Sequence, residues 1–243
     1  MARAVLAISV LLTGRVLADP PVSWRSGDGL PARAVIQASI NPKPLQLPVV
    51  DADDLHFVRL STAQGLSQTR VQQIVQDDSG FIWFGTQYGL NRYDGYKFKV
   101  FAHDSSRTNS LGGMYIYSLF KDRSGILWIG SDQTLDRFDP RTEAFTHYRL
   151  QPRDSNAGGV LVSHINQDHD GYIWLATGAG LFRLDPATGK TTQFQHDPND
   201  PLSLSDSDVK STLEDRNQRF WVANETGLDE FDPRTGKVKL HVP

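Results

Sequence analysis

The feature that most constrains the fold of this chain is an internal repeat. Trp83, Trp128, Trp174 and Trp221 are spaced 45, 46 and 47 residues apart, and the sequences around them align. The chain contains only five tryptophans, so four at a nearly fixed period are not a consequence of composition. Periods of this length are typical of repeat architectures, in which each repeat is one small unit of secondary structure that stacks on its neighbours.

Each period reads as four short strands separated by turns. A first apolar run ends in an aspartate, and a glycine-containing turn then precedes the strand that holds the tryptophan. Gly-Leu pairs and Asp-Pro-x-Thr-Gly-Lys segments mark the later turns, because glycine and proline favour chain reversal between apolar runs. No long stretch has helical periodicity. We therefore predict an all-β fold, namely a β-propeller with four blades of four antiparallel strands.

The predicted blades cover residues 66–102, 111–150, 160–196 and 204–243. Residues 56–60 resemble a spare outer strand, whose blade would take its other three strands from beyond Pro243. Propellers that close with such a mixed blade have no free sheet edge. At about 46 residues a blade, a seven-bladed ring needs about 320 residues. We expect the four blades to be an incomplete part of such a ring.

The first 54 residues differ in composition from the repeats. Residues 1–18 have a basic start, a short apolar stretch and small residues before Asp19, which predicts a signal peptide and export. Residues 19–54 contain prolines at 31, 42, 44 and 48, which favour an extended spacer. The propeller domain is then expected over residues 55–243.

Composition and motifs exclude several kinds of chemistry. The chain has no cysteine, which removes disulfides and Cys-ligated metal sites, and its net charge of −3 argues against nucleic-acid binding. Residues 166–171 resemble the start of a calcium loop. However, the repeat already explains Asp168 and Gly171, and the closing ligand position would fall on Thr177. We predict no catalytic residue, no metal ion and no cofactor.

Residues 65–94 carry a resemblance to a known family. They read Gly-Leu-Ser, then Val-x-x-Ile-x-x-Asp-x-x-Gly-x-x-Trp-x-Gly-Thr-x-x-Gly-Leu-x-x-Tyr-Asp, which resembles the two-component regulator propeller repeat. The later copies follow most of this pattern, and the fourth departs from it at Gln218 and Ala223. The resemblance covers residues 55–243. It implies the periplasmic sensor region of an inner-membrane signalling protein whose output part is a histidine kinase or, alternatively, a diguanylate cyclase.

On this basis the leading hypothesis is a propeller that senses a periplasmic ligand, such as a carbohydrate, or a protein partner. Self-association through the propeller faces is also expected, because uncovered sheets recruit other chains. A secreted propeller enzyme acting on sugars or peptides, and a purely structural scaffold, are the alternatives. The enzyme would need acid and base groups that converge at one end of the channel, and the sequence singles out no such pair.

The repeat also predicts where a ligand would bind. Propellers bind at the mouth of the central channel, on the face that carries the turns between the second and third strands of each blade. These turns vary in sequence while the surrounding strands repeat. Their tips are Gln87-Tyr88, Asp132-Gln133, Gly178-Ala179 and Glu225-Thr226. Solvated turns also vary freely, so the sequence singles out a face of the propeller and no individual ligand-binding residue.

Overall fold

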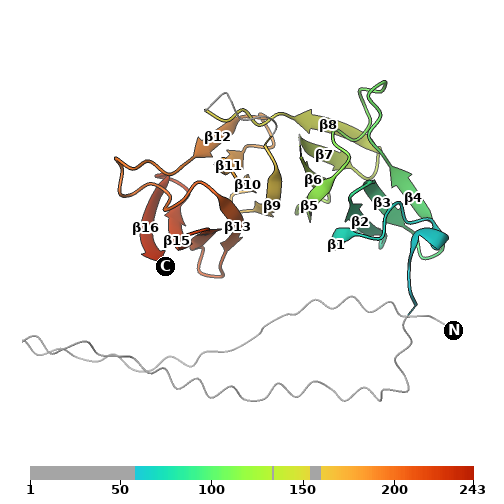
Figure 1. The fold of residues 1–243 in the computed structure, drawn as a ribbon, viewed down its shortest axis with the longest axis horizontal. Helices are drawn as coiled ribbons and strands as arrows, with labels where there is room; N and C mark the ends of the chain where they lie inside the picture. The colour runs from blue at the N-terminus through green and yellow to red at the C-terminus, as the bar shows by residue number, and fades with distance from the viewer. Residues whose placement is uncertain (1–57, 133, 154–159) are drawn as a thin grey trace, which may run out of the picture. The chain divides into compact units, whose positions relative to one another are not determined.

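The computed structural model describes residues 58–243 except 133 and 154–159. The chain divides into two compact units, Met1–His56 and Phe57–Pro243, and the described residues belong to the second. The predicted signal peptide, residues 1–18, and the predicted spacer, residues 19–54, lie outside the described residues. Within the described part there are four antiparallel four-stranded sheets and no α-helix (Figure 1). The predicted all-β fold with four blades of four strands is confirmed.

Each sheet is one blade and takes four strands in chain order. Blade 1 contains β1 (Val71–Gln76), β2 (Ile82–Thr86), β3 (Gly89–Tyr93) and β4 (Phe98–Phe101). Blade 2 contains β5 (Ile116–Lys121), β6 (Leu127–Ser131), β7 (Leu135–Asp139) and β8 (Ala144–Tyr148). Blade 3 contains β9 (Val162–Gln167), β10 (Ile173–Thr177), β11 (Gly180–Leu184) and β12 (Thr191–Phe194). Blade 4 contains β13 (Val209–Glu214), β14 (Phe220–Asn224), β15 (Gly227–Asp232) and β16 (Lys237–Val242).

The spare outer strand expected at residues 56–60 is not formed where the structure describes it. His56 and Phe57 lie outside the described residues, and residues 58–60 have no strand pairing. They lead into a short 3₁₀ helix, η2 (Thr62–Gln64), which Ser61 caps and which ends at Gly65. Each of the four sheets already contains its own outer strand. The prediction assigns residues 56–60 partner strands from beyond Pro243, so it stays a prediction.

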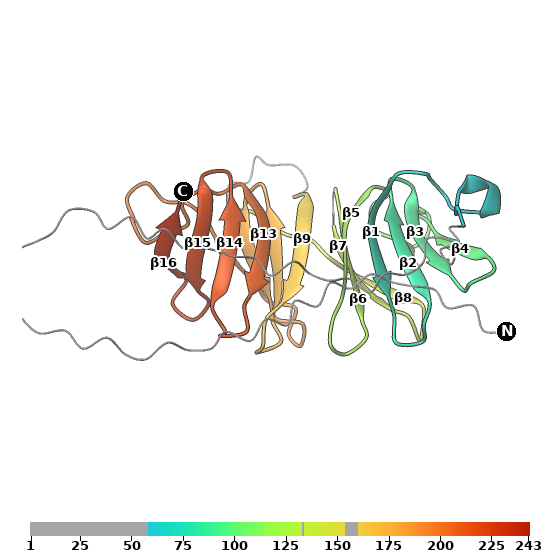
Figure 2. The same ribbon diagram turned by 90° about the horizontal axis from the view of Figure 1, so that it is seen from below.

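The first strand of each blade lies on the inner side of the propeller. Strand β1 lies beside β5, β5 beside β9, and β9 beside β13, as Figure 2 shows from the side of these strands. The sheets pack face to face, so a strand inside the stack is covered on both faces by neighbouring blades. This explains why strands such as β6 and β10 are buried at every residue rather than at alternate residues.

The core consists of three clusters, one at each junction between consecutive blades. Each cluster contains the tryptophan of the earlier blade, packed against apolar side chains of the later blade. Trp83, Trp128 and Trp174 are 0% exposed. Trp221 is only half-buried, because no further blade in the described part of the chain covers its outer face.

A hydrogen bond joins the tryptophan of each blade to the aspartate that follows its first strand. The fully buried bonds run from the indole N–H to a carboxylate oxygen: Trp83 to Asp77 at 2.8 Å, Trp128 to Asp122 at 2.8 Å, Trp174 to Asp168 at 2.7 Å. The other oxygen of Asp77 accepts from the backbone N–H groups of Ser79 (2.9 Å) and Phe81 (3.0 Å). One carboxylate thus fixes both the turn and the tryptophan beyond it.

The corresponding turn of blade 4 is looser. The distance from Trp221 Nε1 to Asp215 Oδ2 is 3.4 Å, and Nε of Arg219 donates to the same oxygen at 2.7 Å. The backbone N–H of Arg219, followed by its side chain, lowers the pKa of Asp215 to about 2. In addition, Gln218 adopts a left-handed φ of 61° where the other blades have glycine. This conformation costs a residue with a side chain about 1–2 kcal/mol relative to glycine.

The Gln218→Gly substitution is therefore expected to stabilise the protein by about 1 kcal/mol. Gly171, which occupies the same turn position in blade 3, supplies the matched control. Its φ is 93°, and a Cβ added there meets nothing closer than 4.0 Å, so a Gly171→Gln variant should lose stability through the backbone alone. Urea unfolding of the three proteins measures both changes, and destabilisation by Gln218→Gly would contradict the strain.

The three buried tryptophans are expected to contribute similar amounts of stability. Replacement of Trp83, Trp128 or Trp174 by alanine should lower the free energy of unfolding by about 3–5 kcal/mol each, since each is enclosed between two blades. Trp221→Ala should cost clearly less, because one face of its ring is uncovered. Denaturant unfolding tests this, and a cost at Trp221 as large as at the other three would show that the four positions are equivalent after all.

Candidate functional site

The first strand of every blade contains a β-bulge near its start. In blade 1, Val71 pairs with Thr86 and Gln73 with Gly85, so Gln72 has no partner in the ladder. The same irregularity leaves one residue unpaired in each of the other blades. We call these four the bulge residues: Gln72, Tyr117, Ser163 and Lys210. A bulge releases a side chain from the alternation of the strand and is frequently found beside binding sites.

The bulges lie at the same end of the blades as the variable turns predicted to surround the channel mouth. The pairing of Val71 with Thr86 places the start of β1 beside the turn that follows β2. Equivalent pairings place the start of β13 beside the turn after β14. The starts of the first strands and the second turns therefore form one surface, which we call the channel mouth.

Blades 1 and 2 contribute a cluster of aromatic and polar side chains to this mouth. The rings of Tyr115 and Tyr117 are stacked, with centroids 4.2 Å apart and an angle of 15° between their planes. The amide nitrogen of Gln72 donates to the hydroxyl of Tyr115 at 3.0 Å. With its amide oxygen turned inward, Gln87 accepts from Tyr115 Oη at 2.6 Å and from Arg70 Nη1 at 2.9 Å. A strand bulge, a turn and two blades thus support one aromatic platform.

Asp132 completes this cluster, which we call the tyrosine cluster. Its Oδ1 atom is buried and finds no hydrogen-bond partner among the described residues. Gly113 lets the carboxylate pack closely, since a Cβ there would lie 3.0 Å from Oδ1. Burial raises the pKa of Tyr117, and the nearby Tyr115 and Asp132 raise it further. A buried oxygen without a partner costs about 1–3 kcal/mol, so such an atom is often completed by a ligand or an ordered water.

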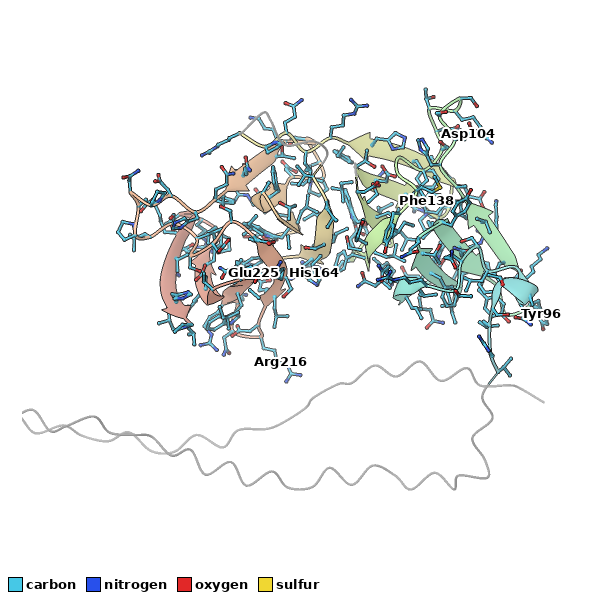
Figure 3. All side chains as sticks on the ribbon, in the orientation of Figure 1. Tyr96, Asp104, Phe138, His164, Arg216 and Glu225 are labelled. Atoms are coloured by element: carbon cyan, nitrogen blue, oxygen red, sulfur yellow. The ribbon has the colours of Figure 1, made fainter. Side chains whose placement is uncertain are left out.

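Blades 3 and 4 give the other half of the mouth a different chemistry. The ammonium of Lys210 lies 2.9 Å from Asp208 and 2.6 Å from Glu225, which raise its pKa. His164 of β9 accepts from the backbone N–H of Thr212 at 3.4 Å, and burial lowers its pKa. Figure 3 labels His164 on blade 3 and Glu225 on blade 4. This half contains ion pairs around Lys210, whereas the half formed by blades 1 and 2 contains the stacked tyrosines.

The predicted turn tips fall into two groups. Gln87, Asp132 and Glu225 each lie against first-strand side chains or loops at the mouth. By contrast, Tyr88 is 55% exposed, and the carbonyl of Ala179 accepts from two glutamines of the outer part of blade 3. Gln133 lies outside the described residues.

Sequence reasoning missed the residues at the start of each first strand, including Arg70, Tyr115 and the bulge residues. A signal was available, because a polar or aromatic residue follows the first residue of each first strand. Such a residue also precedes that strand in three of the four blades, whereas blade 3 has Leu161 there. The bulge itself could not be predicted, since it depends on the pairing of two strands. Within the described part of the chain, no group of three or more His, Asp or Glu side chains is placed to hold a metal ion.

A buried aspartate anchors the loop that carries Tyr115 toward the mouth. Asp136 is 0% exposed, and its Oδ2 accepts from the backbone N–H of Gly112 at 2.6 Å. Nδ1 of His147 lies 2.8 Å from Asp136 Oδ1, while its Nε2 lies 3.0 Å from the carbonyl of Thr108. Both ring nitrogens face acceptors, so both donate only when the imidazole is protonated. In this form His147, a residue of β8, ties the loop between β4 and β5 to Asp136.

Comparison with known proteins supports the repeat and the fold. Residues 65–88 and 110–133 match the family described as "Two component regulator propeller". This confirms the predicted resemblance for the first two repeats. Over 55 residues, the chain is 38% identical to "Histidine kinase P4" of Formosa agariphila, an alignment that covers 23% of this chain and 4% of that protein.

Two solved structures from B. thetaiotaomicron are similar. The extracellular domain of the hybrid two component system BT3049 is 26% identical, with a TM-score of 0.52 over 75% of this chain and 31% of that one. The extracellular domain of the one component system BT4673 is 19% identical, with a TM-score of 0.59 over 74% of this chain and 22% of that one. The chain spans less than a third of each of these relatives. Across residues 58–132, 134–153 and 160–243, no helix is long and apolar enough to cross a membrane.

The His147–Asp136 pair predicts a pH dependence of stability. Burial alone would lower the pKa of His147, but the hydrogen bond and charge of Asp136 outweigh it and raise the pKa above 6.5. Because the pKa is raised in the folded state, protonated His147 contributes fully to the free energy of unfolding below pH 6.5. This contribution is lost as the pH rises through the pKa of the folded state. The wild type should therefore exceed His147→Gln in unfolding free energy by more at about pH 5.5 than at about pH 9.

Denaturant unfolding at the two pH values measures this difference. The matched control is Asp136→Asn, which keeps the histidine but removes the charge that raises its pKa. In the Asp136→Asn protein, the change in unfolding free energy caused by His147→Gln should be nearly the same at the two pH values. A wild-type advantage over His147→Gln that is equal at both pH values would show that the imidazole does not titrate against Asp136.

Proposed function

We propose that this propeller is the exported, periplasmic signal-input region of a membrane-anchored two-component regulator. We further propose that the tyrosine cluster at the channel mouth binds the signal molecule. The observation that carries this proposal is the unpartnered, buried Oδ1 atom of Asp132 beside the stacked pair of Tyr115 and Tyr117. This arrangement has the chemistry of a ligand site that is completed on binding.

The similar proteins support the signalling part of the proposal. The repeat matches a family named for two-component regulators, and two similar solved structures are described as extracellular domains of signalling systems. The matching stretch in a histidine kinase favours a kinase over a diguanylate cyclase as the output of the whole protein. The kinase activity itself would reside in parts of the protein other than this propeller.

The chemistry of the tyrosine cluster suits a small carbohydrate. A sugar ring has an apolar face that packs on an aromatic side chain, and its hydroxyls bond in the ring plane to carboxylate, amide and guanidinium groups. Tyr117 supplies the aromatic surface, and Asp132, Gln87 and Arg70 supply the polar groups. Binding sites of this kind combine apolar surface with a few fixed polar atoms.

A carbohydrate panel tests this proposal. Neutral and acidic mono- and disaccharides are screened against the whole chain by thermal shift, and any that bind are measured by calorimetry. Tyr117→Ala and Asp132→Asn are expected to weaken binding at least about tenfold, because each removes a contact worth about 1.4 kcal/mol or more. Tyr96→Ala is the matched control, since Tyr96 is 93% exposed on the turn between β3 and β4 (Figure 3).

The expected result is a sugar whose affinity falls in both cluster variants and stays within about twofold in the control. Equal binding by all four proteins would place the site elsewhere. If no sugar of the panel binds the wild type, the carbohydrate assignment is wrong.

A further inference from the structure

A cavity lies on the outer rim of the propeller, where the outer strand of blade 3 meets blade 4. Its volume is about 400 Å³, within the range of about 300–1,000 Å³ that small-ligand sites occupy. Its lining comes from β12 and the loop after it, from the turn between β15 and β16, and from Arg153. No residue of the tyrosine cluster is among these lining residues, so the cavity is separate from the channel mouth.

The rim between blades 1 and 2 shows what fills the same place elsewhere in the molecule. Glu143, in the turn between β7 and β8, forms an ion pair with Arg92 of blade 1 at 3.1 Å and a second one with Lys99 of the same blade. The carboxylate of the later blade is thus held by two cations of the earlier blade. Two long side chains and the contact between them close this rim.

In blade 3 a threonine stands at the position of the lysine. Lys99 is the ladder partner of Arg92, and the corresponding partner of Arg183 is Thr192. Both arginines stack on an aromatic ring, with the guanidinium carbon 4.7 and 4.9 Å from the ring centroid. Arg183 donates to the carbonyl of Pro233 at 2.8 Å and forms no ion pair within the described part of the chain. The arginine is therefore retained, whereas its carboxylate partner is missing.

In blade 4 a glycine stands at the position of the glutamate. Gly236 lies 15 residues after Trp221, as Glu143 lies 15 residues after Trp128. Both have a left-handed φ, 73° and 55°, and the N–H of each donates at 2.8 Å to the carbonyl of an aspartate four residues earlier. The two turns are equivalent. A threonine and a glycine thus leave open the space that a lysine and a glutamate fill between blades 1 and 2.

The cavity retains cations that suit a carboxylate. The backbone N–H of Arg153 donates to Gln193 Oε1 at 2.9 Å, which fixes this residue at the rim, while its guanidinium has no partner. Lys237 also lines the cavity and forms an ion pair with Asp200. A guanidinium with free N–H groups matches the two oxygens of a carboxylate, because its donors form a planar fork.

Hydrogen bonds within the walls hold the cavity in shape. The backbone N–H of Asp197 donates to Ser203 Oγ at 2.9 Å, and Oδ1 of Asp197 accepts from the backbone N–H of Asn199 at 2.9 Å. Nδ1 of His196 donates to a backbone carbonyl of the same loop at 2.8 Å. Phe194 packs on the apolar cluster between blades 3 and 4 and supplies apolar surface. A preformed cavity binds its ligand without the cost of ordering a loop.

We propose that this cavity, which we call the rim site, binds a small organic acid whose carboxylate takes the place of the Glu143 carboxylate. Arg153 binds the carboxylate through paired hydrogen bonds, Lys237 adds positive charge, and the carbon body of the acid lies against Phe194. The acid then joins blades 3 and 4 as Glu143 joins blades 1 and 2. The proposal goes beyond the carbohydrate assigned to the channel mouth and does not depend on it.

Acids and their neutral amides are the probes that test the rim site. Glutarate, benzoate and glucuronate, each beside its amide, are titrated into the full chain and followed by calorimetry and ligand-observed NMR. At least one acid should bind at least about tenfold more tightly than its amide, since the amide loses the charge-assisted hydrogen bonds. If no acid binds at about 10 mM, or if acid and amide bind equally, the proposal is wrong.

Substitutions at the cavity locate the binding. Arg153→Gln should weaken binding of the acid at least about tenfold. Arg141→Gln is the matched control, because the Arg141 side chain is 80% exposed in a turn of blade 2, and its affinity should stay within about twofold of the wild type. Thermal melting verifies that the variants fold.

A second pair of variants separates charge from space. Thr192 is exposed, so Thr192→Glu and Thr192→Gln should both fold and occupy similar volume. Only the glutamate offers Arg153 an internal carboxylate, so Thr192→Glu should abolish binding of the acid while Thr192→Gln retains most of it. Unchanged affinity in both Arg153→Gln and Thr192→Glu would overturn the proposal. So would a loss of acid binding in Tyr117→Ala but not in Arg153→Gln, which would place the acid at the channel mouth.

Discussion

The structure depends on the buried hydrogen bond between an aspartate and a tryptophan in each of the first three blades. The indole must be buried to fill the space between two sheets, and its N–H then needs an acceptor that is also buried. The aspartate supplies this acceptor, and its other oxygen accepts hydrogen bonds from two backbone N–H groups of the turn. A single carboxylate therefore sets the turn between the first and second strands and the depth of the tryptophan that the next blade covers.

The same arrangement is looser in the fourth blade. There the aspartate is shared with Arg219, the indole contact lengthens to 3.4 Å, and a glutamine takes the left-handed position of the turn. The blade retains its four strands and their order, since the ladders on both sides of β14 are intact. Strand pairing thus persists where the turn is strained, and it is the packing between blades that varies.

Spacing and turn residues were sufficient to predict the four blades and the burial of their tryptophans, because these depend on local pattern repeated four times. The segment at 56–60 resembles an outer strand in sequence, but a strand forms only beside a partner, so its assignment stays a prediction. Of the candidate site, the turn residues Gln87 and Asp132 were within the predicted surface. Tyr115 and Tyr117 were not: Tyr117 stands at the bulge of the first strand, and Tyr115 precedes that strand, outside the predicted turns.

The bulge has a consequence for how such a mouth can change. Its residue has no directly paired partner in the ladder, so strand register does not depend on which side chain stands there. The bulge residue is glutamine, tyrosine, serine or lysine in the four blades, although the strands around it follow the same sequence pattern. The scaffold and the recognition surface are thereby uncoupled at single residues. A lineage of such proteins can acquire a new specificity by exchanging one side chain at a time, without a shift in the register of the strands.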